Sequence, residues 1–288
     1  MIKLENISFK YKKNTEYTLK DINLNIKNGE FISIIGENGT GKSTLAKIIS
    51  GILLPSFGDV LINNINTKSK KDFINLRKNI SIVFQNPDNQ IIFERVYEEL
   101  KFTLENFKID KNQIDLKIDN ALKSVNMLDK KFENTSSLSL GEKHKIIIAE
   151  ALSLNTDIIV LDEPTAMLDP NSKKQILNLL NDLNKSGKTI ILITHILDEI
   201  FYSNKCIYLN DNKIEEIFNI KDLLTNTSLL EKINKNNSNF LLNTLIECNK
   251  NNIDLKLNNY FENNINKNIP FINYLNKKII ERILNSND

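Results

Sequence analysis

Hydrophobic and polar residues alternate regularly near the start of the chain. Ile22, Leu24 and Ile26 are separated by polar residues, and this period of two is typical of a half-buried strand. Asn28-Gly29 is a turn signal. The run that follows, 31–35, is almost wholly apolar and is typical of a strand covered on both faces, as in a parallel sheet.

Similar short apolar runs recur along the chain at 80–84, 157–161 and 189–193. Helical patterns occupy 44–50 and 172–184, and the second of these separates two of the apolar runs. Strands that alternate with helices in this way indicate an α/β layer fold with a parallel sheet.

Two parts of the chain depart from this alternation. Between Pro87 and Leu152 the pattern becomes helical, which predicts a helical subdomain inserted into the sheet domain. From about Asn219 asparagine becomes very common, and low-complexity disorder is one interpretation of such composition. Apolar residues at helical intervals favour a real helical extension instead; they are Leu241, Leu242, Leu245 and Ile246, and then Ile279, Ile280, Ile283 and Leu284.

Composition narrows the class of protein. The net charge of the 288 residues is only +2, so no global field points to nucleic acid as a partner. Cys206 and Cys248 form no CxxC pair, which argues against a disulfide framework or a cysteine metal site. The start of the chain lacks the apolar stretch of a secretory signal, and no window reaches the roughly 18 apolar residues of a spanning helix. We therefore expect a soluble protein, able to dock on a membrane protein.

The segment 36–43 matches the pattern GxxxxGK[ST] and stands between a predicted strand and a predicted helix. Glycines in such a loop let backbone N–H groups curl around phosphates, and the helix N-terminus adds a favourable dipole. Lys42 is expected to reach the β- and γ-phosphates, and Ser43 to ligate Mg²⁺. A glycine-rich turn with a chance lysine is the alternative. The residues expected to bind ATP here are Gly36, Asn38, Gly39, Gly41, Lys42, Ser43 and Thr44.

Two acids, Asp162 and Glu163, follow the apolar run that ends at Leu161. Buried acids at a strand end are costly unless they serve a site. We expect Asp162 to hold Mg²⁺ and Glu163 to polarise the attacking water as general base. Alone, the pair fits equally well a strand that runs into a helix cap, but the phosphate loop favours the catalytic interpretation.

With these motifs in this order, the chain resembles an ATP-binding cassette (ABC) ATPase over roughly residues 1–220. The resemblance implies a P-loop NTPase sheet core with an inserted helical subdomain. In it, Gln85 corresponds to a glutamine that senses Mg²⁺ and γ-phosphate, and His195 to a switch histidine that contacts γ-phosphate. The segment 167–170 corresponds to a loop that crosses a dimer interface.

Two aromatic side chains leave alternatives open. Tyr11 stands where the family places an aromatic that stacks on adenine, and strand packing is an equal alternative. His144 is expected to be a surface residue rather than part of the site.

The signature of the family is usually LSGGQ, and here it is the segment 138–142, LSLGE. In the family this motif closes over ATP held by the other subunit, so Ser139 and Gly141 are expected to bind nucleotide. Leu140 replaces a glycine whose backbone would approach the γ-phosphate, and Glu142 puts a negative charge near phosphate. The composite site that uses this signature is therefore expected to be weak, whereas the site with Lys42 and Glu163 stays active with a partner's signature.

Further motifs narrow the resemblance. The segments 85–90, 45–47 and 167–170 resemble those of the ATPases of energy-coupling factor (ECF) transporters, and most closely the first of their two ATPase types. The resemblance implies uptake of vitamins or transition-metal ions at the cytoplasmic face of the membrane. It implies as partners a second ECF ATPase or a second copy of this chain, a membrane coupling protein and a substrate-binding membrane protein. Residues 221–288 match an extension that supports dimerisation.

Glu94, Glu98 and Glu99 follow the glutamine loop. In the resemblance this region receives coupling helices that carry arginines, with which carboxylates pair well. A solvated acidic helix face is the equal alternative.

Two other functions compete with transport. One is a soluble ABC ATPase of DNA repair or translation, but the chain has neither a long coiled-coil insertion nor two cassettes. The other is a regulatory nucleotide-binding scaffold, which the altered signature leaves open and which Glu163 and His195 oppose.

Overall fold

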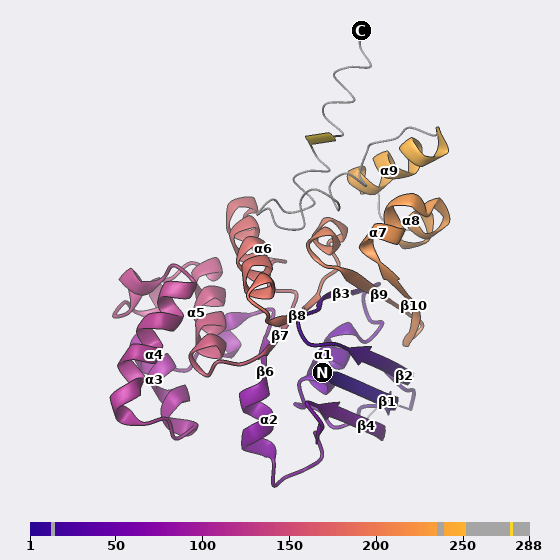
Figure 1. Ribbon diagram of the computed structural model, residues 1–288. Helices are drawn as coiled ribbons and strands as arrows, with labels where there is room; N and C mark the ends of the chain where they lie inside the picture. Colours follow the sequence, from indigo (N-terminus) through magenta and orange to yellow (C-terminus); the bar gives the residue numbers. More distant parts are fainter. Residues whose placement is uncertain (13–14, 235–238, 252–276, 279–288) are drawn as a thin grey trace.

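The computed structural model describes residues 1–12, 15–234, 239–251 and 277–278. Strands and helices alternate through most of this length, and helices alone follow β10 (Figure 1). The strands are β1 (Ile2–Phe9), β2 (Leu19–Ile26), β3 (Phe31–Gly36), β4 (Phe57–Ile62), β5 (Ile65–Asn66), β6 (Ile80–Val83), β7 (Ile158–Asp162), β8 (Thr189–Ile193), β9 (Lys205–Asn210) and β10 (Lys213–Asn219). The helices are α1 (Lys42–Ile49), α2 (Phe73–Asn79), α3 (Val96–Asn106), α4 (Lys111–Ser124), α5 (Leu140–Ser153), α6 (Pro170–Lys185), α7 (Ile220–Thr225), α8 (Thr227–Ile233) and α9 (Phe240–Lys250), with short 3₁₀ turns η1 (Pro87–Asn89), η2 (Leu128–Lys130), η3 (Thr135–Ser137) and η4 (Leu197–Tyr202).

The strands form two sheets. A four-stranded sheet has the order β2-β1-β4-β5, with every pair antiparallel. A six-stranded sheet has the order β10-β9-β3-β8-β7-β6, in which only β10 is antiparallel to its neighbour. The predicted α/β fold with a parallel sheet is confirmed. The carboxyl ends of β3, β6, β7 and β8 meet at one edge of this sheet, because parallel strands end on the same side.

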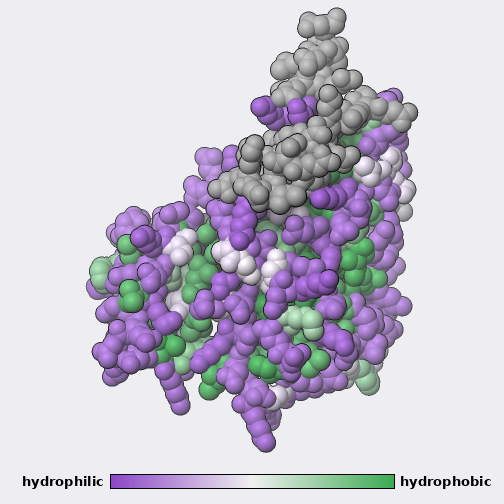
Figure 2. All heavy atoms as spheres, in the orientation of Figure 1, coloured by the Kyte–Doolittle hydropathy of each residue, from purple (hydrophilic) through white to green (hydrophobic). Residues whose placement is uncertain are grey.

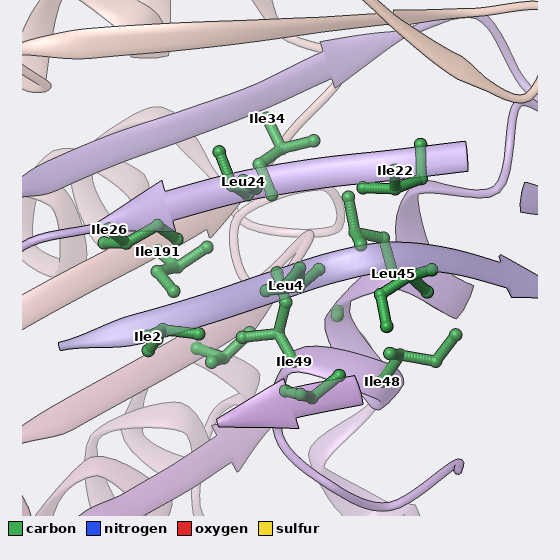
Figure 3. Packing of buried hydrophobic residues seen from close by; sticks show 14 of the residues in the cluster. Ile2, Leu4, Ile22, Leu24, Ile26, Ile34, Leu45, Ile48, Ile49 and Ile191 are labelled. Atoms are coloured by element: carbon green, nitrogen blue, oxygen red, sulfur yellow. The ribbon is translucent and has the colours of Figure 1, made fainter. Parts of the chain in front are cut away.

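Helix α1 lies between the two sheets and fills the first hydrophobic core. Its Leu45, Ile48 and Ile49 are fully buried against β1 and β2 and against one face of the parallel sheet (Figure 3). Alternate residues of β7 and β8 point to the opposite face and join a second core with α3–α6. Both faces of the central strands are therefore covered, which explains why their sequences read as unbroken apolar runs.

Helices α3, α4 and α5 pack together on one side of the parallel sheet, away from the antiparallel sheet (Figure 1). They confirm the helical pattern predicted between Pro87 and Leu152. Helix α5 contacts β6 and η1 and so connects this helical layer to the segment that carries Gln85.

The described C-terminal helices share a third core with β9, β10 and η4. Leu241, Leu242, Leu245 and Ile246 are buried on α9, as their helical spacing predicts. The second predicted group, Ile279 to Leu284, lies outside the described residues. On the face shown in Figure 2, hydrophilic residues predominate and hydrophobic residues gather in patches between them. Within the described ranges, every helix is too short or too polar to cross a bilayer.

Candidate nucleotide site

The phosphate loop connects β3 to α1, as the sequence predicts. Gly41, immediately before the helix, has a φ of +93°, and a Cβ there would lie 2.7 Å from the carbonyl oxygen of Thr18. A Cβ on Gly36 would lie 2.4 Å from the carbonyl oxygen of Leu209. Both positions therefore exclude any side chain, because the loop passes so close to neighbouring backbone.

Lys42 folds its side chain back over this loop. Its Nζ donates to the carbonyl oxygens of Gly36 (2.8 Å) and Glu37 (2.9 Å), and the residue is 5% exposed. Burial lowers the pKa of Lys42. The nearby negative charges of Glu163 and Asp162 raise it, but they offset the effect of burial only in part. A phosphate group beside Nζ would restore the stability of the charged ammonium.

Ser43 and Asp162 are brought together from 119 positions apart. The Ser43 hydroxyl donates to Oδ1 of Asp162 at 2.9 Å. Burial raises the pKa of Asp162, and the hydrogen bond from Ser43 lowers it only in part. Such a site, a buried carboxylate beside a hydroxyl oxygen, fits a hard cation such as Mg²⁺, whose charge would favour the ionised carboxylate.

The other two predicted catalytic residues, Gln85 and His195, both contact one carboxylate oxygen of Glu163. Its Oε2 accepts a hydrogen bond from Nε2 of Gln85 at 3.1 Å, and Nδ1 of His195 lies 3.2 Å away. Gln85 follows β6, Glu163 follows β7 and His195 follows β8, which are neighbouring strands of the sheet. The topology thus places a carboxylate, an amide and an imidazole at the edge where the phosphate loop also begins.

Tyr11 packs against the strand residue Phe9 and also borders the candidate nucleotide site. Its ring packs edge-on against Phe9, with centroids 4.9 Å apart, and its hydroxyl lies 3.1 Å from Oγ1 of Thr44. The ring is also 38% exposed and lines a cavity of about 510 Å³ beside the phosphate loop. This volume suits a small-molecule ligand. The other residues around the cavity are Glu16, Tyr17, Thr18, Asn38, Gly39, Gly41, Lys42, Ser43, Thr44, Glu163 and Asn212.

Several of these lining residues carry no signal in the sequence. Asn212 reaches the cavity from the turn between β9 and β10, and its Nδ2 donates to the carbonyl oxygen of Tyr17 at 3.2 Å. Only the pairing of distant strands brings this turn to the phosphate loop.

Ser139 and Gly141 lie apart from the phosphate loop and line a different cavity of about 310 Å³. Ser139 is the N-cap of α5, and Glu142 closes a capping box with it. Oε2 of Glu142 accepts hydrogen bonds from both the backbone N–H and the hydroxyl of Ser139, each at 2.8 Å. These two bonds are the main reason that the pKa of Glu142 is lowered.

Two expectations from the sequence are wrong. His144 is not a surface residue: it is 1% exposed, and its Nδ1 lies 3.0 Å from the carbonyl oxygen of Leu140. It points inward because α5 packs against β6, a contact that no local pattern reveals. Glu99 is buried as well, and its Oε2 accepts from the backbone N–H groups of Ile92 and Phe93. Glu99 therefore belongs to neither an acidic groove nor a solvated face, whereas Glu94 and Glu98 are exposed.

Comparison with known proteins identifies the relatives of this chain. The ABC transporter family model matches residues 19–166. The energy-coupling factor transporter ATP-binding protein EcfA1 of Fusobacterium nucleatum is 42% identical over 75% of this chain and 81% of its own. The EcfA1 protein of Clostridium novyi is 38% identical over 81% of this chain and 85% of its own.

Solved structures agree in fold. The cbiO1 protein of Clostridium perfringens, described as part of the ABC transporter complex cbiONQ, is 37% identical. It superposes with a TM-score of 0.72 over 82% of this chain and 95% of its own. The ATP-binding cassette MJ0796, solved as a post-hydrolysis dimer with ADP and Pi, is 32% identical, with a TM-score of 0.69 over 76% of this chain and 99% of its own. The chain therefore belongs to the ABC transporter ATPase family and, within it, to the EcfA1-type ATP-binding proteins of energy-coupling factor transporters.

Proposed function

We propose that this chain binds and hydrolyses ATP as one subunit of an ECF importer for vitamins or transition-metal ions. The observation that carries the proposal is the convergence of Gln85 and His195 on Oε2 of Glu163, next to the phosphate loop. The names of the EcfA1 relatives support the assignment to an ECF transporter.

The chemistry follows from what these side chains can do. Lys42 and the N-terminus of α1 bind and orient the phosphates. The oxygen of a water attacks the γ-phosphorus and forms a new P–O bond, while the bond to the bridging oxygen of ADP breaks. ADP leaves with the electron pair, and Glu163 takes the proton of the water. His195 lies 3.2 Å from Glu163, and in this proposal its imidazole contacts the developing charge on the phosphoryl group.

Mg²⁺, held by Ser43 and Asp162 with Gln85 nearby, would supply positive charge to the phosphate oxygens. The pairing of Ser43 with Asp162 supports this role, because the exposed hydroxyl of Ser43 already faces the buried carboxylate of Asp162.

The experiment is hydrolysis by the purified transporter complex that contains this chain. Glu163→Gln removes the base and keeps the shape, so ATP turnover is expected to fall by about 10²–10⁴-fold while ATP still binds. Glu5→Gln is the matched control, because Glu5 lies on β1 in a surface ion pair with Lys3. Full turnover by the Glu163 variant would refute the proposed chemistry.

We propose further that the chain docks peripherally, at the cytoplasmic face, on a membrane coupling protein that works with a substrate-binding membrane protein. Exposed acids and apolar groups lie together near the start of α3: Glu94 and Glu98 are exposed, and Ile92 is 72% exposed. Carboxylates of this kind pair well with arginines. Glu98→Lys is expected to reduce assembly of the complex without loss of ATP binding, whereas Asp182→Lys on α6 is the control. Equal assembly of both variants would refute the docking role.

The signature supports an asymmetric dimer with a second ECF ATPase rather than two equal sites. Glu142 occupies the N–H and hydroxyl donors of Ser139, so these donors are not free to hold a phosphate. We infer that the site closed by this signature is weak and that the site with Lys42 and Glu163 is active. The Glu→Gln change in the catalytic glutamate of each ATPase subunit separately tests this asymmetry, because equal losses from both would refute it.

We also propose that the chain consists of an ATPase domain, residues 1–220, and a C-terminal extension, residues 221–288, that supports dimerisation. Phe240 on α9 is 71% exposed, which leaves a large apolar side chain available to a partner. Phe240→Glu is expected to lower the fraction of ATPase dimer measured by light scattering. An unchanged fraction would argue against this part of α9 as the contact.

A further inference from the structure

Glu199 is a fully buried carboxylate that the proposed chemistry does not use. It lies on η4, four residues after His195, with a relative exposure of 0%. A carboxylate in such a place is costly unless other groups hold it. Its partners therefore show what this part of the fold requires.

The partners of Glu199 come from two other segments. Oε1 accepts a hydrogen bond from the Thr165 hydroxyl at 2.5 Å, and Nζ of Lys173 lies 3.2 Å from the same oxygen. Thr165 is itself 2% exposed and lies two residues after Glu163. Lys173 is in the first turn of α6, shortly after the segment 167–170. Oε2 has no hydrogen-bond partner among the described residues.

The backbone around Thr165 is a tight turn that begins at Glu163. Glu163 has a φ of +50°, which is uncommon for a residue with a side chain. Its N–H donates to the carbonyl oxygen of Ile193 at 3.0 Å, and its carbonyl accepts from Ala166 at 3.3 Å. The carbonyl of Thr165 accepts from the N–H of Leu168 at 3.2 Å. The direction of the Glu163 side chain therefore depends on how this turn is held.

We propose that Glu199 is a positioning residue that fixes the turn of Glu163 relative to the segment that carries His195. Glu163 and His195 follow adjacent strands, β7 and β8, and their side chains meet only beyond the strand ends. The Glu199–Thr165 hydrogen bond joins the two segments just past this meeting point, and Lys173 adds the start of α6. The inference rests on the proposed function, because it concerns the geometry of the same base.

The test compares two threonines in the assembled transporter complex. Thr165→Val removes the hydroxyl and keeps the shape of the side chain, and Thr165→Ser keeps the hydroxyl. Thr189→Val is the matched control: Thr189 is equally buried at the far end of β8, where its hydroxyl accepts from the N–H of Gly29 at 2.9 Å. Turnover and KM for ATP are measured for each variant, and Glu163→Gln in the same assay tests the proposed function separately.

Thr165→Val is expected to lower kcat by about 10- to 100-fold, because small misplacement of a catalytic group costs this much, while KM for ATP changes by less than about threefold. Thr165→Ser is expected to keep kcat within about threefold of the parent, and Thr189→Val to leave it unchanged. Glu199→Gln is also measured alone. The kcat of the double variant Thr165→Val/Glu199→Gln is expected to be no lower than that of the slower of its two single variants, since both changes act through one contact.

Equal kcat for Thr165→Val and Thr189→Val would overturn the proposal. So would loss of kcat in Thr165→Ser, because the hydroxyl is present there, or fully additive losses in the double variant. If Glu163→Gln hydrolyses ATP at the full rate, the proposed chemistry with Glu163 as the base fails as well. If Glu163→Gln is inactive while Thr165→Val keeps full kcat, only the positioning role fails.

Discussion

The side-chain amide of Gln85 donates a hydrogen bond to Oε2 of Glu163 across 3.1 Å, although 78 positions separate the two residues. Gln85 follows β6, which is connected through η1 to α5 of the helical layer, and Glu163 follows β7 of the sheet. A movement of the helical layer relative to the sheet would therefore change the surroundings of the proposed base directly.

The first prediction concerns this contact. Gln85→Ala removes the donor to Glu163 and one oxygen proposed to lie near Mg²⁺. Turnover by the complex is expected to fall about tenfold or more, and the Mg²⁺ concentration for half-maximal turnover to rise. The measurement is ATPase activity in a Mg²⁺ titration, with Gln113→Ala on the exposed face of α4 as control. An unchanged Mg²⁺ midpoint would contradict the metal role of Gln85.

The second prediction concerns Lys42. Its buried amine donates to two backbone carbonyls of the loop, an arrangement that a phosphate would improve. Lys42→Met is expected to weaken ATP binding by about 10- to 100-fold, the usual effect of one charge-assisted contact. Equilibrium binding of a slowly hydrolysed ATP analogue measures this, with Lys27→Met as the exposed control. Equal affinity of the two variants would contradict the phosphate-binding role.

The third prediction is a pH dependence of stability from Glu150, which lies between α5 and α3. Burial raises its pKa to about 7 from an ordinary value of 4.5; the Thr103 hydroxyl, which donates at 2.7 Å, opposes this, and the charge of Glu99 adds to it. The folded state thus binds more protons than the unfolded state between pH 4.5 and 7. The protonated Glu150 carboxyl therefore makes a contribution to the free energy of unfolding that is fully present below about pH 4.5 and is lost as pH rises through about 7.

Glu150→Gln removes this titration and is therefore expected to gain stability relative to the parent at pH 8 but not at pH 5. The upper limit of the gain is about 3 kcal/mol, because the pKa of Glu150 is about 7 in the folded state and 4.5 ordinarily. Denaturant unfolding at both pH values measures it, and Glu105→Gln on the exposed side of α3 is the control. An equal change at both pH values would show that the Glu150 carboxyl does not titrate in this window.

The fold was predictable because local patterns and global topology agree along most of the chain. The runs that became β3, β6, β7 and β8 are apolar throughout because both faces of the sheet are covered. The segment 36–43 and the acids after β7 were predictable for a related reason, since phosphate binding requires these residue types at fixed places beside a strand and a helix.

The rest depends on contacts between distant segments. His144 has an ordinary helical sequence around it, and only the packing of α5 on β6 buries it. Glu199 resembles any acid in a turn until Thr165 and Lys173 are placed beside it. Glu99 looks like its exposed neighbour Glu98, but its carboxylate caps the backbone of Ile92 and Phe93. No local period distinguishes these side chains, because their roles depend on partners elsewhere in the chain.

The last prediction separates the two roles of Tyr11. The edge-on contact with Phe9 and the hydrogen bond with Thr44 hold the ring in place, and its exposed part lines the cavity beside the phosphate loop. Tyr11→Ala removes the ring and is expected to weaken ATP binding by about 2- to 12-fold, the range of one aromatic contact. Tyr11→Phe keeps the ring and loses only the hydroxyl, so its ATP affinity is expected to stay close to that of the parent.

Tripolyphosphate, which has no base, provides the decisive comparison for Tyr11. This ligand has no adenine to stack on the ring. Tyr11→Ala is therefore expected to keep the affinity of the parent for tripolyphosphate and to have a lower affinity than the parent for ATP. Competition between each ligand and a labelled ATP analogue measures both affinities. Equal losses for ATP and tripolyphosphate would mean that Tyr11 only packs against Phe9 and supports the loop through Thr44. A selective loss for ATP would show that the ring contacts the base.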